Sequence, residues 1–372
     1  MDHLGKSIKK LGFGLMRLPM LDGEVDIEQV KAMADRFLAT GFTYFDTAYG
    51  YIGGKSEAAV KAAVVDRYPR ESFQLATKLP AWAGAKNAEE ARQMFYTSLN
   101  RTGAGYFDFY LLHNCGGERT KVFEDYDLWN FVLEQRAKGL IKHIGFSIHD
   151  SADALDKLLT RHPEAEFVQL QINYADWESP SVQSRMCYEA AQKHGKPVII
   201  MEPVKGGLLA APPEPVAKVL READEGVSYA SWAVRYAASL DNVITVLSGM
   251  SSIEQMEDNL ATMKNFRALD EKEQKAVERA REALEKIPGI PCTSCEYCMK
   301  GCPRLIPIPG ALGAMNRVLV YDNLTIAKSD YFWATNRHGK ASDCIACGNC
   351  ESVCPQHISI IEELKRAAGT LE

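Results

Sequence analysis

The sequence predicts an α/β protein: a parallel (β/α)8 barrel followed by a small, mainly α-helical domain that is rich in cysteine. Short apolar runs alternate with amphipathic helical stretches down to about residue 264, and such alternation is typical of a parallel sheet. Eight units of this kind in roughly 260 residues match a (β/α)8 barrel in number and length. Eight of the ten cysteines lie at or beyond Cys292, which indicates a second domain there.

The expected strands are nearly continuous apolar runs, as befits strands that are covered on both faces. They are residues 8–18, 43–48, 73–78, 107–113, 141–148, 167–174, 197–204 and 243–248. Helical stretches between them include residues 27–40, 88–102 and 182–194. A doubly wound open sheet is the alternative, but no G-x-G-x-x-G motif follows the first strand.

The composition and net charge are those of a globular protein and argue against binding to nucleic acid. The 372 residues are 46% hydrophobic and 25% charged, which is close to the average for a soluble globular protein. The formal net charge is −6, whereas nucleic-acid-binding proteins typically carry an excess of basic residues. No apolar run reaches the roughly 18 residues that span a bilayer, and the first ten residues hold no hydrophobic signal core. We therefore expect no nucleic-acid or membrane partner and a cytoplasmic location.

Three titratable residues end three successive expected strands. Asp46, Lys78 and His113 occupy these positions, and Tyr51 follows the Asp by five residues. Each alone has a structural interpretation, as a cap, a surface charge or a packed histidine. Catalytic groups of a (β/α)8 barrel lie at the C-terminal ends of its strands, so together these residues predict an active site.

The segments DTAYGYIGGKSE, ATKL and FDFYLLHN resemble the aldo-keto reductases, over about residues 8–264. This resemblance implies that Tyr51 is the general acid that protonates the carbonyl oxygen. It implies that Lys78, paired with Asp46, lowers the pKa of Tyr51, and that His113 orients the carbonyl. A cation near a phenol favours the phenolate, which is consistent with these roles.

The same resemblance implies a nicotinamide site, NAD(H) or NADP(H), at the ends of later strands. Ser147 and Gln169 match carboxamide contacts of the family, and Met201 stands where an aromatic residue commonly stacks on the nicotinamide. The Asn that usually follows the Ser is Ile148 here.

The adenosine end of the dinucleotide is implied to lie in LSGMSSIEQMEDNL, where Asp258 and Asn259 keep the adenine-side pattern. Gly249 and Gln255 replace the usual Lys and Arg for a 2′-phosphate. Losing two cationic partners removes charge-assisted hydrogen bonds, so NADH and NADPH both remain open.

Two copies of the pattern C-x2-C-x2-C-x3-C-P occur in the tail. This is the spacing of bacterial [4Fe–4S] ferredoxin runs, in which the fourth cysteine ligates the other cluster. Zinc is the competing interpretation, since C-x2-C pairs also bind zinc. If the fourth cysteine of each run ligates the cluster of the other run, one cluster is held by Cys292, Cys295, Cys298 and Cys354. The other cluster is then held by Cys344, Cys347, Cys350 and Cys302.

The segments around the two runs complete the expected domains. Between the runs, 305–320 and 325–335 should be helical, as in the α-helical ferredoxins of larger reductases, and similar Ile-containing segments after each run indicate internal duplication. A charged helix over 270–287 opens with a capping box of Asp270 and Glu273. The expected domains are a barrel at 1–268, a linker helix at 269–288 and a ferredoxin-like domain with two [4Fe–4S] clusters at 289–372.

The whole chain resembles aldo-keto reductases that carry a C-terminal ferredoxin-like domain. The implied function is an oxidoreductase that interconverts a small-molecule carbonyl and an alcohol, with a ferredoxin or other carrier as electron partner. Hydride transfer moves two electrons whereas a cluster moves one, so coupling them normally needs a converter such as a flavin, which stays an option. The alternatives are a plain NAD(P)H carbonyl reductase with structural clusters, and an electron-transfer or redox-sensing protein whose barrel is a docking scaffold.

Overall fold

The computed structural model describes residues 4, 5 and 7–372 and consists of two compact units. The first contains the chain up to Gly207 together with Val227–Gln274. The second contains Leu208–Gly226 and Lys275–Glu372. A short excursion of the chain after Gly207 thus contributes to the C-terminal unit before the last barrel strand is formed.

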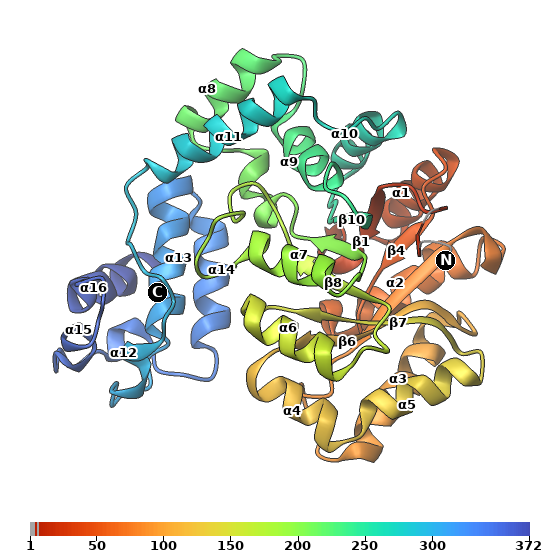
Figure 1. Cartoon of the computed structure of the whole chain (residues 1–372), viewed down its shortest axis with the longest axis horizontal. Helices are drawn as coiled ribbons and strands as arrows, with labels where there is room; N and C mark the ends of the chain where they lie inside the picture. The colour runs from red at the N-terminus through yellow and green to blue at the C-terminus, as the bar shows by residue number, and fades with distance from the viewer. Residues whose placement is uncertain (1–3, 6) are drawn as a thin grey trace. The chain divides into compact units, whose positions relative to one another are not determined.

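The first unit is a closed parallel barrel of eight strands, which confirms the predicted fold class (Figure 1). Around the barrel the order is β1, β10, β9, β8, β7, β6, β5, β4, and β4 pairs with β1 to close it. A small antiparallel pair, β2 (Met20–Leu21) and β3 (Glu24–Val25), lies outside the barrel. The barrel strands are β1 (Leu11–Gly14), β4 (Tyr44–Asp46), β5 (Gln74–Leu79), β6 (Phe107–Cys115), β7 (Ile141–Ile148), β8 (Phe167–Gln171), β9 (Val198–Met201) and β10 (Val243–Ser248).

Helices cover the outside of the barrel (Figure 1). Several start where a polar side chain accepts a hydrogen bond from a free backbone N–H, as Asp26 does from Gln29 N at 3.0 Å and Asn87 from Glu90 N at 2.9 Å. The helices of this unit are α1 (Ile27–Ala39), α2 (Lys55–Val60), α3 (Ala88–Thr102), α4 (Gly117–Asp125), α5 (Leu128–Ala137), α6 (Ala152–Arg161), α7 (Ser184–Lys193), α9 (Tyr229–Ala238) and α10 (Ile253–Lys264).

Strand β6 shows why the strands are apolar without alternation. Phe107, Tyr110 and Leu112 pack into the core between strands and helices. Phe109 and Leu111, on the opposite face, fill the barrel interior. Because both faces of the strand are buried, both sets of side chains must be apolar.

Four expected strands are shorter in the structure. The strand expected at 43–48 spans only Tyr44–Asp46, as β4. β1 ends at Gly14 and continues as a 3-10 turn, Leu15–Arg17. β8 ends at Gln171 rather than residue 174, and β9 ends at Met201 rather than residue 204. At the end of β9, Glu202 takes a positive φ of 57°, a conformation that no strand accommodates. The chain therefore leaves the sheet there to form the mouth of the barrel.

The second unit is helical. α13 packs against both α14 and α16, and its buried residues share one apolar core with those of α16. The predicted capping box before α11 is present, with Asp270 N donating to Glu273 Oε2 at 3.0 Å and Glu273 N to Asp270 Oδ1 at 2.9 Å. The remaining helices are α8 (Glu214–Ala223), α12 (Tyr297–Lys300), α13 (Ile308–Tyr321), α14 (Leu324–Thr335), α15 (Asn349–Ser352) and α16 (Ile360–Leu371), together with α11 (Glu271–Glu285), which begins in the first unit and enters the second at Lys275.

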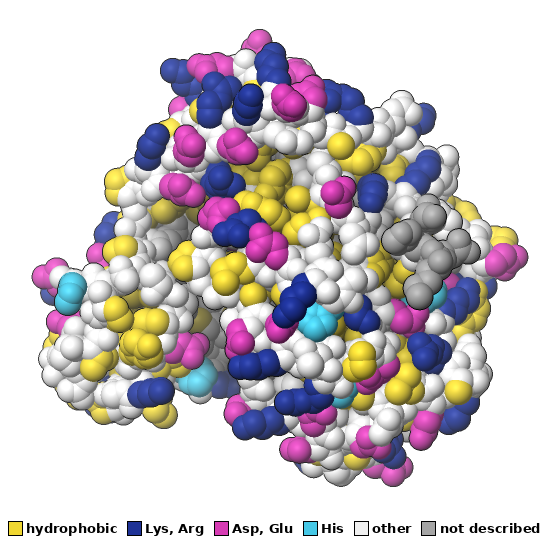
Figure 2. All heavy atoms as spheres, viewed as in Figure 1, with side chains coloured by type: hydrophobic (Ala, Val, Ile, Leu, Met, Phe, Trp, Pro, Cys, Tyr) yellow, Lys and Arg dark blue, Asp and Glu magenta, His cyan; other side chains and the backbone are white. Residues whose placement is uncertain are grey.

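The face of the molecule seen in Figure 2 carries charges of both signs. Lys and Arg side chains are interspersed with Asp and Glu over the face seen in Figure 2. This mixture differs from the single-sign basic patch that is typical of nucleic-acid-binding proteins. Among the helices of the described chain, none has the length and apolar character that crossing a membrane requires.

Candidate functional site

The four residues of the predicted catalytic group lie at the C-terminal ends of three neighbouring strands. Asp46 is the last residue of β4, Lys78 is the fifth residue of β5, and His113 lies near the end of β6. Tyr51 begins the 3-10 turn Tyr51–Gly54 that follows β4. Because β4, β5 and β6 are consecutive around the barrel, the structure brings the four side chains to one mouth.

Lys78 and Asp46 form a buried ion pair at the base of this site. Lys78 Nζ lies 2.5 Å from Asp46 Oδ1 and donates to Thr47 O at 2.7 Å. Lys78 is 0% exposed and Asp46 is 2% exposed. Burial lowers the pKa of Lys78, but the Asp46 carboxylate and the Tyr51 phenol raise it more, so its net pKa lies above the ordinary value. The ammonium group is therefore charged at neutral pH and fixed in place.

Tyr51 sits over this ammonium, with Lys78 Nζ 4.8 Å from the centre of its ring. Burial raises the pKa of Tyr51, Lys78 lowers it, and Asp46 and Glu202 raise it again, so the net pKa is above the usual value. The expectation that Lys78 lowers the pKa of Tyr51 therefore describes only one contribution, which burial outweighs. The phenol holds its proton at neutral pH and can donate it.

His113 is a neutral imidazole beside Tyr51. The two rings meet edge to face with centroids 5.8 Å apart. Burial lowers the pKa of His113 well below its usual range, and the charges of Lys78 and Arg119 lower it further. Its Nδ1 is buried without a hydrogen-bond partner among the described residues. The indole of Trp82 fixes the adjoining backbone by donating to His113 O at 2.6 Å.

A row of polar side chains, Asn114, Ser147 and Gln169, continues along the ends of β6, β7 and β8. Ser147 and Gln169 are register neighbours, and Ser147 Oγ accepts a hydrogen bond from Asn114 N at 2.8 Å. Within the described chain, Gln169 Oε1 and Asn114 Oδ1 are buried and have no partner, while Gln169 Nε2 reaches only Met201 Sδ at 3.5 Å. Buried amide oxygens without donors fit a ligand that brings a primary amide, such as a nicotinamide.

Sequence reasoning missed Asn114 as part of this row. Its signal is conformational: φ of 56° turns the chain just after His113, and Asn tolerates that region better than most residues. The strand pairing shifts between Leu112 and Cys115 at the same point. Neither feature is visible in the letters of the sequence.

The expected adenine-side residues lie on α10, directly after the last barrel strand. Ser228, the N-cap of α9, donates to Asp258 Oδ2 at 2.7 Å. Asn259 Nδ2 donates to Gln255 O at 2.8 Å, and Asn259 Oδ1 is buried without a partner in the described chain. Asp258 thus serves packing between two helices, and Asn259 keeps one unused acceptor.

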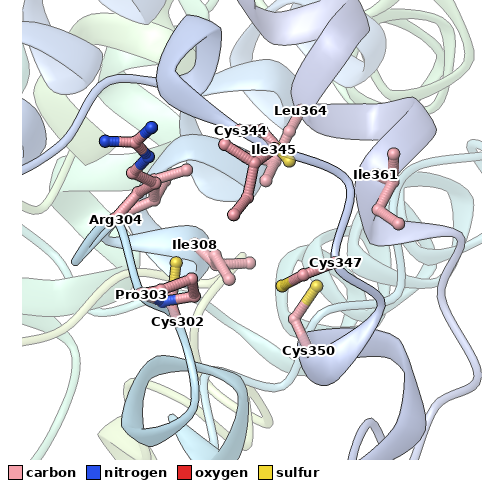
Figure 3. A pocket seen from close by; sticks show the side chains of 11 residues that line it. Cys302, Pro303, Arg304, Ile308, Cys344, Ile345, Cys347, Cys350, Ile361 and Leu364 are labelled. Carbon is pink, nitrogen blue, oxygen red and sulfur yellow. The ribbon is translucent and has the colours of Figure 1, made fainter.

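The cysteines of the two runs interleave in space. Cys302, from the first run, lines one cavity together with Cys344, Cys347 and Cys350 from the second run. Figure 3 shows Cys302 on one side of this cavity and Cys347 and Cys350 on the other, with Ile308 and Ile361 among the apolar residues around them. Four thiols around an otherwise largely apolar cavity are a donor set that fits a [4Fe–4S] cluster.

The first cysteine run is similarly influenced by a cysteine of the second run. Burial raises the pKa of the Cys292 thiol, a backbone hydrogen bond at Ser294 lowers it, and the thiols of Cys295 and Cys354 raise it further. Cys354 of the second run is therefore within electrostatic range of Cys292. Across residues 4, 5 and 7–372, no three His, Cys, Asp or Glu side chains converge closely enough to hold a single metal ion.

The two runs share one backbone conformation. Positive φ angles recur at matching places, at Ser294 and Glu296 in the first run and at Ala346 and Gly348 in the second. Short helices, α12 and α15, then carry the third cysteine of each run, and α13 and α16 begin at matching isoleucines. In each run the second cysteine is exposed and the third is buried. The repetition is consistent with the internal duplication expected from the sequence.

Comparison with known proteins agrees with the barrel and with the cysteine-rich tail. Residues 10–282 match the aldo/keto reductase family, and residues 291–359 match the 4Fe-4S dicluster domain. L-galactose dehydrogenase of Arabidopsis thaliana is 23% identical over 308 residues, covering 78% of this chain and 95% of the relative.

Two solved structures share the fold. An aldo-keto reductase from Bacillus halodurans in its holo form superposes with a TM-score of 0.60 at 24% identity, covering 75% of this chain and 95% of the other. A Klebsiella pneumoniae aldo-keto reductase in complex with NADPH gives 0.56 at 22% identity, covering 73% and 90%. With nearly three quarters of its length matched by the family, the chain belongs to the aldo/keto reductases, and it carries a C-terminal 4Fe-4S dicluster domain.

Proposed function

We propose that this oxidoreductase interconverts a carbonyl and an alcohol at Asp46, Tyr51, Lys78 and His113, with a nicotinamide dinucleotide as cofactor, and that two [4Fe–4S] clusters exchange electrons in its catalytic cycle. The observation that carries the proposal is the buried Lys78–Asp46 pair beneath Tyr51. Burying two charges is costly unless they are paired. A scaffold has no need for such a pair under a phenol at the mouth of a barrel.

The side chains divide the work of proton transfer. Tyr51, protonated because burial raises its pKa, donates its proton to the carbonyl oxygen. Lys78 supports the resulting phenolate, because its charge is fixed by Asp46. His113, neutral because burial lowers its pKa, can donate a hydrogen bond that orients the same oxygen. When bound, a nicotinamide supplies or accepts a hydride, and the clusters carry single electrons.

The nicotinamide site is supported by the polar row at the ends of β6 to β8, in which the amide oxygens of Asn114 and Gln169 have no partner in the described chain. Ser147 and Gln169 would hold the carboxamide, and Met201 would lie next to the ring. The Klebsiella pneumoniae structure, described as a complex with NADPH, supports a nicotinamide on this fold. NADH and NADPH both remain candidates, since Gly249 and Gln255 offer no cation to a 2′-phosphate.

The cluster proposal keeps the two exchanged ligand sets. Cys344, Cys347, Cys350 and Cys302 would hold one cluster, which is supported by their common cavity. Cys292, Cys295, Cys298 and Cys354 would hold the other, which is supported by the electrostatic influence of Cys354 on Cys292. The exposed Cys295 and Cys347 leave an edge of each site open to a ferredoxin or other electron carrier.

The first test is made on anaerobically purified protein, after a check for bound flavin. Dithionite-reduced clusters are titrated with NAD+ and with NADP+ while cluster absorbance is followed. Reoxidation by either nucleotide is expected, and it would name the cofactor. Intact clusters that react with neither nucleotide would contradict direct exchange and favour structural clusters or a separate carrier.

The second test concerns the proton donor. Tyr51→Phe should abolish carbonyl reduction and leave the iron content unchanged, because the phenol oxygen lies in the barrel and the cysteines in the tail. Iron analysis and steady-state rates on the same preparation measure both. Normal turnover in this variant would refute the acid role of Tyr51.

A further inference from the structure

The charged groups around the proposed acid and its neighbour pair off, with one exception. Those that act on Tyr51 and His113 are Asp46, Lys78, Glu202, Arg119 and the imidazole of His149, whose pKa is lowered by burial. Asp46 pairs with Lys78 at 2.5 Å, and Glu202 pairs with Arg17 at 3.2 Å. In the described part of the chain, Arg119 has no carboxylate within 4.0 Å.

The acidic residues near Arg119 form hydrogen bonds or ion pairs with other groups. Asp150 accepts hydrogen bonds from Gly117 N through Oδ2 at 2.9 Å and from Ser151 N through Oδ1 at 2.7 Å. Glu118, the preceding residue, pairs with Lys121 at 2.7 Å. Arg119 is therefore not ion-paired, although the Asp150 carboxylate lies close by, since a Cβ on Gly116 would meet Asp150 Oδ2 at 2.8 Å and Arg119 Nη2 at 3.2 Å.

Arg119 is also held in a defined position. It lies in the first turn of α4. Its Nε donates at 2.8 Å to the backbone oxygen of Asn114, which is the residue after His113. Its Cζ is 6.0 Å from the ring of Trp82, and the Trp82 and His113 rings are 6.3 Å apart. Because Nε is used by the backbone, the fork of Nη1 and Nη2 remains to bind an anion.

The position is an unfavourable one for a cation without a ligand. The first turn of a helix carries the positive end of its dipole, which repels a cation and attracts an anion. A planar guanidinium with two free nitrogens binds a carboxylate through two parallel hydrogen bonds. Asp150 Oδ2 already accepts from Gly117 N at the start of α4, so a bound carboxylate would chiefly neutralise the guanidinium.

We propose that Arg119 binds a carboxylate on the substrate, so that the enzyme acts on carbonyl compounds that carry an acidic group. This inference rests on the proposed carbonyl reduction at Tyr51 and names its substrate class. The carbonyl lies at Tyr51 and His113, the body of the substrate lies against Trp82, and the carboxylate reaches Arg119. Arg119 is thus a specificity-determining residue.

A phosphate of the dinucleotide is the other anion that could reach this guanidinium. The row formed by Asn114, Ser147 and Gln169 is the proposed nicotinamide end, whereas the adenosine end is expected on α10. Trp82 and α4 follow β5 and β6, beside His113. The geometry therefore favours the substrate, and the experiment separates the two sources.

The test compares 4-formylbenzoate with its neutral methyl ester on the full-length holoenzyme. Binding is measured by calorimetry and kcat/KM by nucleotide absorbance, for the native protein, Arg119→Gln and Arg119→Lys. Lys121→Gln is the matched control, since it removes a positive charge from the same helix that is already paired with Glu118. Iron content and circular dichroism establish that each variant is folded.

We expect the native protein and Lys121→Gln to prefer the carboxylate over the ester at least tenfold. Arg119→Gln should lose this preference, Arg119→Lys should keep part of it, and the Kd for the nucleotide should not change. An equal preference in Arg119→Gln, no preference in the native protein, or a tenfold loss of nucleotide affinity in Arg119→Gln would overturn the inference. Turnover that survives Tyr51→Phe would refute the proposed function instead, with the binding preference unaffected.

Discussion

Asp46→Asn removes one partner of a buried ion pair and leaves the other without compensation. Lys78 is 0% exposed, and its remaining polar neighbours are the Thr47 carbonyl and the Tyr51 phenol. Breaking a buried pair by removing one partner costs about 3–5 kcal/mol. For a unit of this size each kcal/mol lowers Tm by roughly 2–4 °C. We therefore expect Tm of the barrel to fall by about 10 °C near neutral pH.

The loss should depend on pH in a defined direction. In the native protein the pKa of Lys78 is raised, so the stability that the pair contributes is present below the unfolded pKa of about 10.4 and is lost above the folded one. In Asp46→Asn burial acts without the carboxylate and should bring the folded pKa below the unfolded one. The unfolded chain then binds more protons, so the stability of the variant should rise with pH between the two values.

The assay is thermal unfolding followed by circular dichroism at about pH 6 and about pH 9.5, with cluster absorbance recorded separately. Asp66→Asn is the control, because Lys61 and Asp66 are also 2.5 Å apart but are 41% and 51% exposed. An exposed pair is worth only about 0–1 kcal/mol, so this variant should shift Tm little. A native-like Tm for Asp46→Asn at both pH values, or a deficit that grows towards high pH, would refute the reasoning.

Two further predictions follow from the site. Carbonyl reduction should show no inflection near pH 6.5, the usual pKa of histidine, because burial keeps His113 neutral, and an inflection there in kcat/KM would contradict this. Cys302→Ala should disturb the same cluster as Cys347→Ala, since both line one cavity. The electron paramagnetic resonance spectra of the reduced variants should therefore match each other and differ from that of Cys295→Ala, and a match of Cys302→Ala with Cys295→Ala would refute the exchanged ligand sets.

Local patterns in the sequence were sufficient to predict the barrel and its strands. Both faces of a barrel strand are buried, so continuous apolar runs such as that of β6 reveal it without reference to the rest of the chain. The ends of β8 and β9 were predicted too late, because the chain leaves the sheet through backbone conformations such as the positive φ of Glu202. Such conformations depend on the contacts of the mouth and leave no periodic signal.

The sequence by itself determined the fold class, the residue types at the strand ends and the spacing of two cysteine runs, since periodicity and ligand spacing are local properties. The closure of the barrel decided the burial, alignment and charge pairing of the side chains at the site. It buried Tyr51 enough to reverse the expected direction of its pKa shift, and it aligned Asn114 with Ser147. It also left Arg119 without a carboxylate within 4.0 Å among the described residues. Burial, register and charge balance arise from segments far apart in the chain, so only the tertiary structure could decide them.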